Sequence, residues 1–321
     1  VLGHYPKLPA GPGPNVRTAI ARFDQGRLTA QELEEVLDEA TREAIREQAE
    51  AGLDLITDGQ IRWEDGQTYF ARKLGGFAIN GLLRYFDTNT YFRQPVPQGK
   101  VSWQGPISVR DWQFAQEHAP VPVKAVVTGP YTLARLSQLG TYSDVRSLAL
   151  DLARALNQEA RALEQAGATF IQFDEPAIVQ RAWKADLPLL EEVSHVVTGG
   201  LTATTAVATW FRDAEGLTPG LFHLPFQVIG LDFVGGPRNY ELLGDFPAGK
   251  ALMAGIVDAR NTKMETVEQI VEAVRRLTAH VAPDRLYVNP SAGLEYLPRP
   301  TARAKLQRLV EGARRAQEVL V

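Results

Sequence analysis

No cysteine occurs among the 321 residues of this chain. That absence excludes disulfide bonds, cysteine nucleophiles and zinc sites built from thiolates. No apolar run reaches the length of about 18 residues that suggests a membrane-spanning helix. Long basic runs are absent as well, and the net charge is −4, from 34 Lys and Arg against 38 Asp and Glu. We therefore expect neither a nucleic-acid partner nor a membrane.

The composition that is present is ordinary for a folded protein. Charged residues make up 22% of the chain and hydrophobic residues 45%, which predicts a packed core. The length fits one large domain or two small ones. The opening residues VLGHYPKLP do not have the pattern of a signal peptide, so we expect a cytoplasmic location.

Eight segments have the apolar pattern of buried strands, and most are followed by a helical pattern. They are Val1–Tyr5, Leu53–Thr57, Val121–Val127, Thr169–Ala177, Leu201–Thr209, Gln227–Phe233, Ala251–Val257 and Leu286–Asn289. The last two begin about 35 residues apart, which is the spacing of a strand–helix unit. Eight such units predict a (β/α)8 TIM barrel that spans residues 1–321 as a single domain. An open doubly wound sheet is the alternative, but the Gly-rich phosphate-binding turn expected after its first strand is absent.

Two other segments have distinctive patterns. Thr29–Ala51 has helical spacing, and Thr29 with Glu32 forms the pattern of a capping box. Phe77–Ser108 follows the second predicted strand and is rich in Tyr, Phe, Pro and Gly with weak alternation. We expect a hairpin-like excursion there, lying over one mouth of the barrel.

Polar side chains recur where the predicted strands end. Seven of the eight strands deliver one, namely His4, Asp58, Thr128, Asp174, Asp232, Asp258 and Asn289. Because ligands bind at the carboxyl ends of parallel strands, these residues predict a site at one face of the barrel. The acids among them would repel one another unless a cation, such as Arg260 or a ligand ammonium group, lay between them. Glu295 and Arg299, after the last strand, are further candidates.

The pair Asp174 and Glu175 is the strongest of these candidates. It ends the apolar segment TFIQFDEPA, and two acids at the end of a buried strand are costly unless they have a function. Asp174 is therefore the first candidate for catalysis, together with Asp232 and Asp258. For Glu175 two roles stay open, a substrate contact and a structural role as a helix cap or ion-pair partner.

Four motifs resemble those of the C-terminal catalytic domain of cobalamin-independent methionine synthase, in the same order. GHYP is similar to the family's Gly-Ser-Phe-Pro, VPVKAVVTGPYT to KPVKGMLTGPVT, IQFDEPA to IQIDEPA, and NPSAGL to NPDCGL. The family lies in the barrel superfamily that also holds uroporphyrinogen decarboxylase. The resemblance implies a methyltransferase that acts on homocysteine or a related amino acid.

The resemblance also implies a zinc site, and here the sequence departs from the family. The positions that match the zinc ligands hold Ala208, Trp210, Asp232 and Ala292, and three of these residues are not zinc ligands. We therefore expect no metal and no other cofactor. The tryptophan that stacks on the folate in the family falls on Leu136. The methyl donor is left open, with a methyl-donor protein such as a methyl-corrinoid protein as one alternative.

The part of the family's pocket that binds the amino and carboxylate groups of the substrate is closer to the family pattern than the zinc site is. The resemblance implies that the backbone at Gly3 receives the substrate carboxylate and that Asp174 holds its ammonium group. The family's second acid at this place falls on Gln60, and a histidine of the family falls on Arg260. The other residues that we expect to bind substrate are His4, Asp58, Glu175 and Asn289.

Two alternatives to a methyltransferase stay open. One is a metal-free enzyme of different chemistry on the same barrel, as in the decarboxylase relatives. The other is a barrel that binds an amino acid without catalysis. The first alternative would act on a cationic or carboxylate-bearing substrate, and the second would bind an amino acid. The expected partner is a small molecule, and we expect an amino acid.

Overall fold

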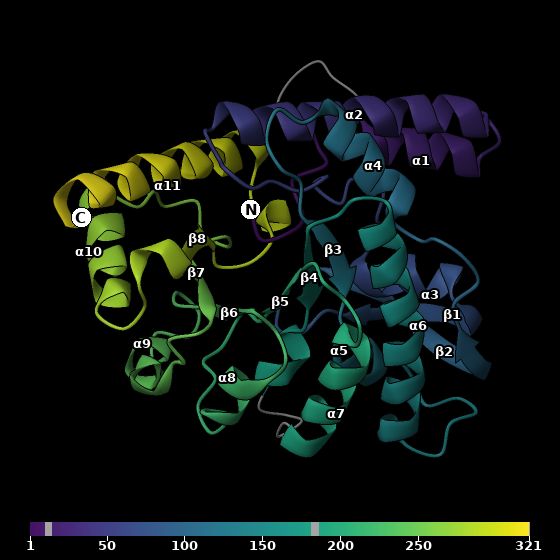
Figure 1. Ribbon diagram of the computed structural model, residues 1–321. Helices are drawn as coiled ribbons and strands as arrows, with labels where there is room; N and C mark the ends of the chain where they lie inside the picture. Colours follow the sequence, from purple (N-terminus) through teal and green to yellow (C-terminus); the bar gives the residue numbers. More distant parts are fainter. Residues whose placement is uncertain (10–14, 181–185, 321) are drawn as a thin grey trace.

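The computed structural model describes residues 1–9, 15–180 and 186–320, and a parallel sheet lies at its centre (Figure 1). Its strands follow one another in the order β3-β4-β5-β6-β7-β8. They are β3 (Ala125–Thr128), β4 (Phe170–Asp174), β5 (Thr204–Ala208), β6 (Val228–Asp232), β7 (Ala251–Val257) and β8 (Leu286–Pro290). Each strand pairs with the next one along the chain in parallel. This is the sequential α/β arrangement of a TIM barrel.

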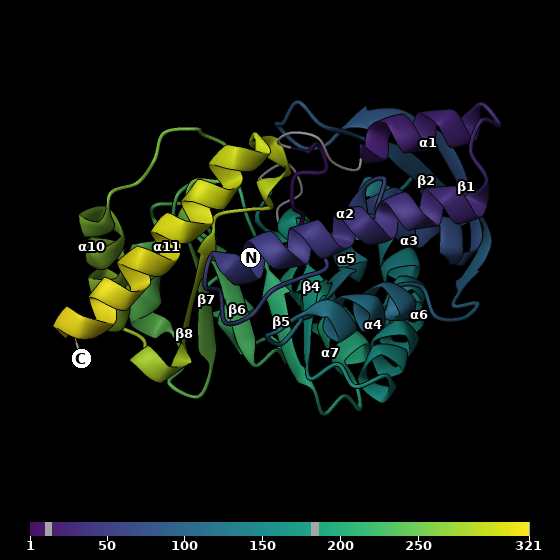
Figure 2. The same ribbon diagram turned by 90° about the horizontal axis from the view of Figure 1, so that it is seen from above.

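Helices cover the outside of the sheet, and Figure 2 shows α2 and α11 running along the same side of it. The α-helices are α1 (Val16–Asp24), α2 (Ala30–Glu50), α3 (Gly66–Lys73), α4 (Val109–His118), α5 (Pro130–Leu136), α6 (Val145–Gln165), α7 (Leu187–Thr198), α8 (Gly220–His223), α9 (Asn239–Leu242), α10 (Val267–Thr278) and α11 (Arg299–Leu320). The capping box predicted at Thr29 and Glu32 is present at the start of α2. Among the described residues, every helix is too short or too polar to cross a membrane.

The second predicted strand, Leu53–Thr57, is wrong as a strand assignment. It makes a single parallel bridge, between Ile56 and Val123. The Ile56 N–H donates to the Pro122 carbonyl at 3.1 Å, and the Lys124 N–H donates to the Ile56 carbonyl at 3.0 Å. Two bonds place the segment beside β3, but a strand needs a longer ladder.

The first predicted strand, Val1–Tyr5, is wrong for a related reason. The segment has no strand ladder. Its backbone makes two isolated hydrogen bonds, from the Tyr5 N–H to the Gly59 carbonyl at 2.9 Å and from the Leu294 N–H to the His4 carbonyl at 2.8 Å. Bonds from side chains also hold it. The Thr57 hydroxyl donates to the Gly3 carbonyl at 3.1 Å, and the Gln172 amide donates to the Leu2 carbonyl at 2.6 Å. Among the described residues the barrel therefore consists of the six parallel strands β3 to β8, and β8 does not pair back to β3 to close it.

The excursion expected over residues 77–108 is confirmed as a β-hairpin. Its strands are β1 (Gly75–Arg84) and β2 (Tyr91–Ser102), and they pair antiparallel. Gly76 is needed where the hairpin begins, since its φ is +90° and a Cβ there would lie 2.6 Å from the Lys100 carbonyl oxygen. The unpredicted helix α3 leads into the hairpin.

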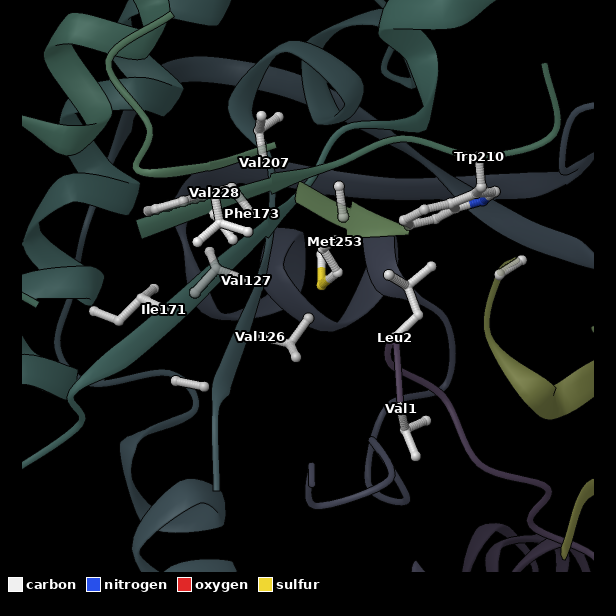
Figure 3. Close-up of a cluster of buried hydrophobic side chains, with 14 of the residues drawn as sticks. Val1, Leu2, Val126, Val127, Ile171, Phe173, Val207, Trp210, Val228 and Met253 are labelled. Carbon is white, nitrogen blue, oxygen red and sulfur yellow. The ribbon is translucent and has the colours of Figure 1, made fainter. Parts of the chain in front are cut away.

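Buried hydrophobic side chains pack around the strands (Figure 3). Strand residues such as Val127, Ile171, Phe173 and Val207 are fully buried, on the face of the sheet opposite to Gln172 and Asp174. The burial accounts for the nearly continuous apolar runs of the sequence, because strands of a parallel sheet are covered on both faces. Figure 3 also shows Val1 and Leu2 within this cluster, which agrees with the burial of the first segment.

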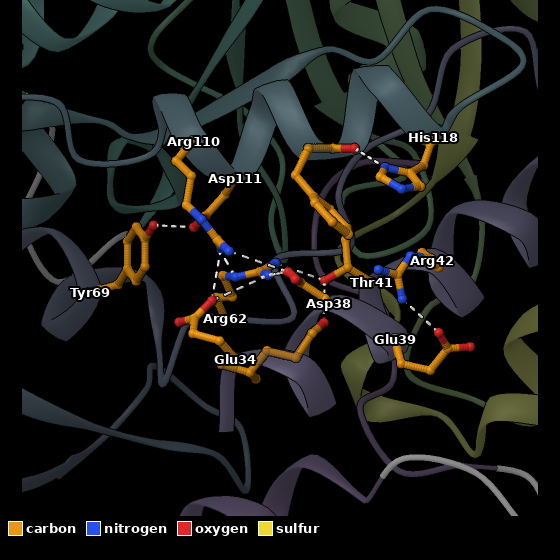
Figure 4. A network of polar contacts seen from close by, with 12 residues as sticks. Glu34, Asp38, Glu39, Thr41, Arg42, Arg62, Tyr69, Arg110, Asp111 and His118 are labelled. Atoms are coloured by element: carbon orange, nitrogen blue, oxygen red, sulfur yellow. Dashed lines mark hydrogen bonds and ion pairs between the residues drawn. The ribbon is translucent and has the colours of Figure 1, made fainter. Parts of the chain in front are cut away.

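A polar network fixes the loop that joins Leu53–Thr57 to α3 (Figure 4). The Arg62 side chain is only 6% exposed and pairs with Asp38 of α2 and, at 3.5 Å, with Asp111 of α4. Asp111 in turn accepts the hydroxyl of Tyr69 from α3. One buried guanidinium therefore joins three helices, and this holds the start of the loop that carries Trp63.

Candidate functional site

A cavity of about 300 Å³ opens where the parallel strands end. Thr128 and Asp174, the last residues of β3 and β4, line it, and Trp210 and Gly293 line it just beyond β5 and β8. The hairpin forms the opposite wall through four residues, Tyr85, Thr90, Tyr91 and Phe92. The site thus lies at the carboxyl ends of the strands, where sequence analysis expected it.

Asp174 is held at the bottom of the cavity by a buried chain of side chains. Its Oδ1 accepts the Gln172 amide at 2.6 Å, and Gln172 Oε1 accepts the ammonium group of Lys124, also at 2.6 Å. Asp174 is 7% exposed. Burial raises its pKa to about 7, against the opposing effects of Gln172 and Lys124. Asp174 is therefore held in one position, and its ionised form is unfavourable there until a ligand cation binds beside it.

Glu295 is a second acid of the cavity. Its Oε2 is buried and has no hydrogen-bond partner among the described residues. Burial raises the pKa of Glu295 to about 7. Sequence reasoning named it only as an accessory, because it lies in the 3-10 helix η5 (Leu294–Tyr296) rather than at a strand end. Its companion Arg299 points elsewhere, pairing with Glu47 at 3.0 Å.

Lys7 supplies positive charge, and sequence reasoning missed it because it lies in a Pro-rich loop. It lines the cavity and donates to the carbonyl of Trp63. Burial lowers the pKa of Lys7 to about 8, while Glu295 and other acids partly offset that effect. His4 lines the same wall with its ring edge-on to Trp63, at 5.5 Å between centroids. Burial lowers the pKa of His4 to about 3, and Lys7 adds to the shift, so this imidazole is neutral at physiological pH.

Gly3 and Gln60 lie against each other at the edge of the site. Gly3 lines the cavity, and a Cβ on it would stand 2.9 Å from Gln60 Oε1. Gln60 is fully buried, and both polar atoms of its amide lack a hydrogen-bond partner among the described residues. The structure therefore places Gln60 directly behind Gly3.

The carboxylates of Glu175 and Asp232 both accept hydrogen bonds from backbone N–H groups. The Glu175 carboxylate accepts the N–H groups of Tyr131 at 2.9 Å and Thr132 at 2.7 Å, at the start of α5. Glu175 is thus a helix cap, but of α5, which precedes it in the chain, and not of the helix that follows. Asp232 accepts three N–H groups at 2.7 to 2.8 Å, among them that of Phe211. Each carboxylate fixes a loop that borders the cavity.

Three other expected residues, Asp58, Asp258 and Asn289, are outside the set that lines the cavity. Asp58 accepts the Gln60 N–H at 3.0 Å, and burial raises the pKa of Asp58 to about 6. Asp258 accepts the N–H of Arg260 at 2.8 Å in the turn after β7. The Asn289 amide donates to the carbonyl of Pro290 at 2.6 Å. Each of these polar groups makes a hydrogen bond to the backbone of the segment in which it lies.

Arg260 links the loop after β7 to the tip of the hairpin. Its guanidinium donates to the Asp87 carbonyl at 3.0 Å and lies 4.7 Å from the centre of the Phe211 ring. Asp87 belongs to the turn between Tyr85 and Thr90, two residues that line the cavity. Arg260 is exposed and so acts on the outside of this turn.

Arg260→Ala is therefore expected to loosen the hairpin tip and weaken ligand binding about 3- to 10-fold, because a cation–π contact and one exposed hydrogen bond are worth roughly 1 kcal/mol. Isothermal titration with homocysteine, the amino acid that the sequence motifs imply, measures this. Arg276→Ala is the matched control, since Arg276 stacks on Tyr240 at 3.6 Å away from the cavity. Equal affinities for both variants would contradict a clamping role.

The sequence model of the cobalamin-independent synthase catalytic domain matches residues 1–315. The chain belongs to this family. It is 31% identical to the methionine synthase of Saccharolobus solfataricus over 324 residues, which cover 100% of this chain and 95% of that protein. The methionine synthase of Sulfolobus acidocaldarius is also 31% identical, with 92% of its length covered. Both relatives match along nearly their whole length.

A solved structure supports the same assignment. The B12-independent methionine synthase from a Shewanella species, in complex with selenomethionine, has a TM-score of 0.81 and 27% identity to this chain. The match covers 92% of this chain and 91% of that one. A putative B12-independent methionine synthase from Listeria monocytogenes has a TM-score of 0.76 at 17% identity, which shows the shared fold. The barrel class and the methyltransferase family expected from the motifs are confirmed.

The residues at the family's zinc positions do not fit a zinc ion. Ala208 and Ala292 are buried and carry no donor atom. The indole of Trp210 offers only an N–H. Asp232 has both carboxylate oxygens engaged by backbone N–H groups. Throughout residues 1–9, 15–180 and 186–320, no group of three or more His, Cys, Asp and Glu side chains is arranged to hold a metal.

The buried carboxyl groups predict that stability falls as pH rises. Burial raises the pKa of five of them to about 6 or 7, namely Asp58, Asp174, Glu175, Asp232 and Glu295. The folded protein keeps these protons where the unfolded chain has lost them, so the stabilisation is complete below about pH 4 and is lost through about pH 7. Four groups whose pKa values burial lowers strongly act in the opposite direction, but the five carboxyl groups outnumber them; the four are the Val1 amino group, His4, Lys7 and Lys124.

We expect the free energy of unfolding, measured with urea, to be lower at pH 8 than at pH 5. Glu175→Gln should flatten this slope, because the amide does not titrate. A free energy that rises with pH over this interval would contradict the assignment of neutral buried carboxyl groups.

Proposed function

We propose that this protein transfers a methyl group to the sulfur of an amino-acid thiol bound in the cavity, without a zinc ion. The observation that carries the proposal is the Asp174 carboxyl, buried at the end of β4 and fixed by Gln172. A carboxylate in such a place binds an ammonium group strongly, because little water competes. The Shewanella relative, which is described in complex with selenomethionine, supports an amino acid of that kind as ligand.

The cavity offers partners for both ends of an amino acid. The ammonium group would lie on Asp174, and the carboxylate would lie toward Lys7 and the backbone at Gly3, all of which line the cavity. Lys7 keeps its charge at neutral pH, since its pKa is about 8. The neutral ring of His4 adds no charge that would compete with the ammonium group.

The thiol itself requires a base when no metal is present. A thiol with a pKa of about 8.5 is mostly protonated at pH 7. Glu295 has a pKa of about 7 and a buried oxygen without a hydrogen bond among the described residues. A base with this pKa is suited to accept the thiol proton near neutral pH. The transfer then needs only a methyl donor at the sulfur, either a small molecule or one carried by a donor protein.

The proposal is tested by a methylation assay on chelator-treated protein. Homocysteine is incubated with methylcobalamin, a methylfolate, S-adenosylmethionine and glycine betaine in turn, and methionine is measured by mass spectrometry. We expect methionine with at least one donor, at a rate that EDTA does not reduce and zinc does not raise. Formation of methionine only after zinc is added would overturn the metal-free part. No methylation of homocysteine or of other amino-acid thiols would overturn the proposal as a whole.

A further inference from the structure

We infer that the cavity also binds a methylated onium ion, a quaternary ammonium or sulfonium compound, and that this ion is the methyl donor. The inference rests on the proposed function and adds the chemical class of the donor. Two observations carry it, a group of aromatic rings and the Glu295 carboxyl, whose buried Oε2 has no hydrogen-bond partner among the described residues.

The cage is formed by Tyr85, Trp210 and Tyr296, which come from the hairpin, the loop after β5 and η5. All three line the cavity. Phe211 stands behind them as a common support, with its ring centre 6.5 Å from that of Tyr85, 6.3 Å from Trp210 and 6.0 Å from Tyr296. Aromatic rings around a small cavity attract methylated cations through their negative faces.

Negative charge gathers at the same place. The pKa of Tyr85 is raised well above its ordinary value, first by burial and then by its acidic neighbours, which include Asp174 and Glu295. The pKa of Tyr296 is raised as well, first by burial and then by the charge of Glu295, with which Tyr296 also shares a hydrogen bond. The cage and the acids therefore lie within electrostatic range of one another. Three rings with a nearby carboxylate form the usual environment for an onium ion.

A count of charges leaves Glu295 for the second ligand. Glu64 is paired with a surface arginine, and Asp65 caps α3. That leaves Asp174 and Glu295 against Lys7 among the described residues lining the cavity. An amino acid brings one ammonium group for Asp174 and one carboxylate for Lys7. Lys7 is also the cation that acts on Glu295 in the absence of a ligand. When the ligand carboxylate takes Lys7, Glu295 is left without a cation of its own, and an onium group would supply one.

The reaction balances in atoms and charge. The thiol proton passes to the Glu295 carboxylate as the sulfur forms a bond to the methyl carbon. The bond from that carbon to the onium nitrogen or sulfur breaks, and its electron pair stays on the departing amine or sulfide. The onium nitrogen or sulfur becomes uncharged, any carboxylate of the donor keeps its charge, and Glu295 becomes uncharged at the same time. The cavity therefore loses one positive and one negative charge together, which is favourable where water is excluded.

The binding test uses glycine betaine and its uncharged-headgroup isostere, 3,3-dimethylbutanoate. Isothermal titration in the presence of selenomethionine should give a lower Kd for betaine than for the isostere. Tyr296→Leu should raise the betaine Kd about 10-fold and Glu295→Gln about 10- to 100-fold. The isostere should change by less than about 3-fold in Glu295→Gln, which also shows that this variant is folded. Tyr287→Leu is the matched control, because Tyr287 is 39% exposed near the start of β8, at the opposite end of the strands.

Asp174 and Glu295 should bind different ligands, so a substitution of Glu295 should affect betaine and selenomethionine differently. Glu295→Gln should leave selenomethionine binding within about 3-fold of the unchanged protein, whereas the betaine Kd rises. Equal Kd values for betaine and the isostere would overturn the inference, as would a Glu295→Gln variant that binds betaine as before.

A methyl-transfer assay then distinguishes the donors. Homocysteine with glycine betaine should yield methionine and dimethylglycine, and with dimethylsulfoniopropionate methionine and methylthiopropionate. Either product pair supports the inference and identifies the ammonium or the sulfonium source. Methionine formed from methylcobalamin or a methylfolate alone would overturn the onium donor and leave the proposed function standing. No methionine from any donor would overturn both.

Discussion

Asp174→Asn is expected to weaken selenomethionine binding about 100-fold or more and to remove methyl transfer, while the protein stays folded. Asp174 is buried, and the ammonium group of an amino acid would meet its carboxylate with little water between them. Removing one partner of a buried charge pair costs about 2–5 kcal/mol in binding. The substitution changes one oxygen for an NH2 group, so the shape of the site is kept.

The fold should tolerate this substitution for a specific reason. Gln172 donates to Asp174 Oδ1 at 2.6 Å, and the carbonyl oxygen of an asparagine accepts the same bond. Burial has already raised the pKa of Asp174 to about 7, so an uncharged group suits its surroundings. We therefore expect a change in the free energy of unfolding of no more than about 1 kcal/mol.

Isothermal titration at several pH values provides the measurement. In the unchanged protein the affinity for selenomethionine should rise between pH 6 and pH 8, as Asp174 loses its proton, whereas Asp174→Asn should show a flat profile. Asp284→Asn is the matched control, because Asp284 is exposed just before β8, at the other end of the strands. Full affinity in Asp174→Asn would rule out the ammonium-binding role of this residue.

Glu159→Ala is expected to lower the free energy of unfolding by about 3–5 kcal/mol. Glu159 is fully buried in α6, and its carboxylate accepts four hydrogen bonds at 2.8 to 2.9 Å. The donors are the Trp103 indole, the Ile107 N–H and two groups of Ser108. They belong to the segment that returns from the hairpin to α4. Alanine would leave these donors buried without an acceptor.

Urea unfolding measures the loss, and Glu164→Ala supplies the control. Glu164 is in the same helix and accepts three hydrogen bonds at 2.6 to 2.8 Å from Thr202 and Ala203, but it is partly exposed, so water can replace it. We expect a loss of about 1 kcal/mol there. Because the hairpin forms a wall of the cavity, Glu159→Ala should also weaken ligand binding. Equal losses of stability in the two variants would mean that burial does not determine how much the Glu159 hydrogen bonds stabilise the protein.

The sequence by itself determined the parts of the molecule that depend on local pattern. The six strands that pair in parallel were all predicted, because their residues are apolar on both faces and each is bounded by Gly, Pro or polar residues. The capping box of α2 was predicted from Thr29 and Glu32, since a cap depends on residues three apart. The motifs identified the family, and the position of Asp174 at a strand end placed it in the cavity.

Only the tertiary structure decided which polar residues face that cavity. Asp174 and Asp232 have the same pattern in the sequence, each at the end of an apolar strand, yet Asp174 lines the cavity and Asp232 binds the backbone of neighbouring loops. Glu295 and Lys7 come from segments without a strand pattern and reach the site through folding. The aromatic cage is drawn from three elements far apart in the chain. The direction of a side chain after a strand end depends on loop geometry and on the N–H groups nearby, and these are set by long-range contacts that no local pattern encodes.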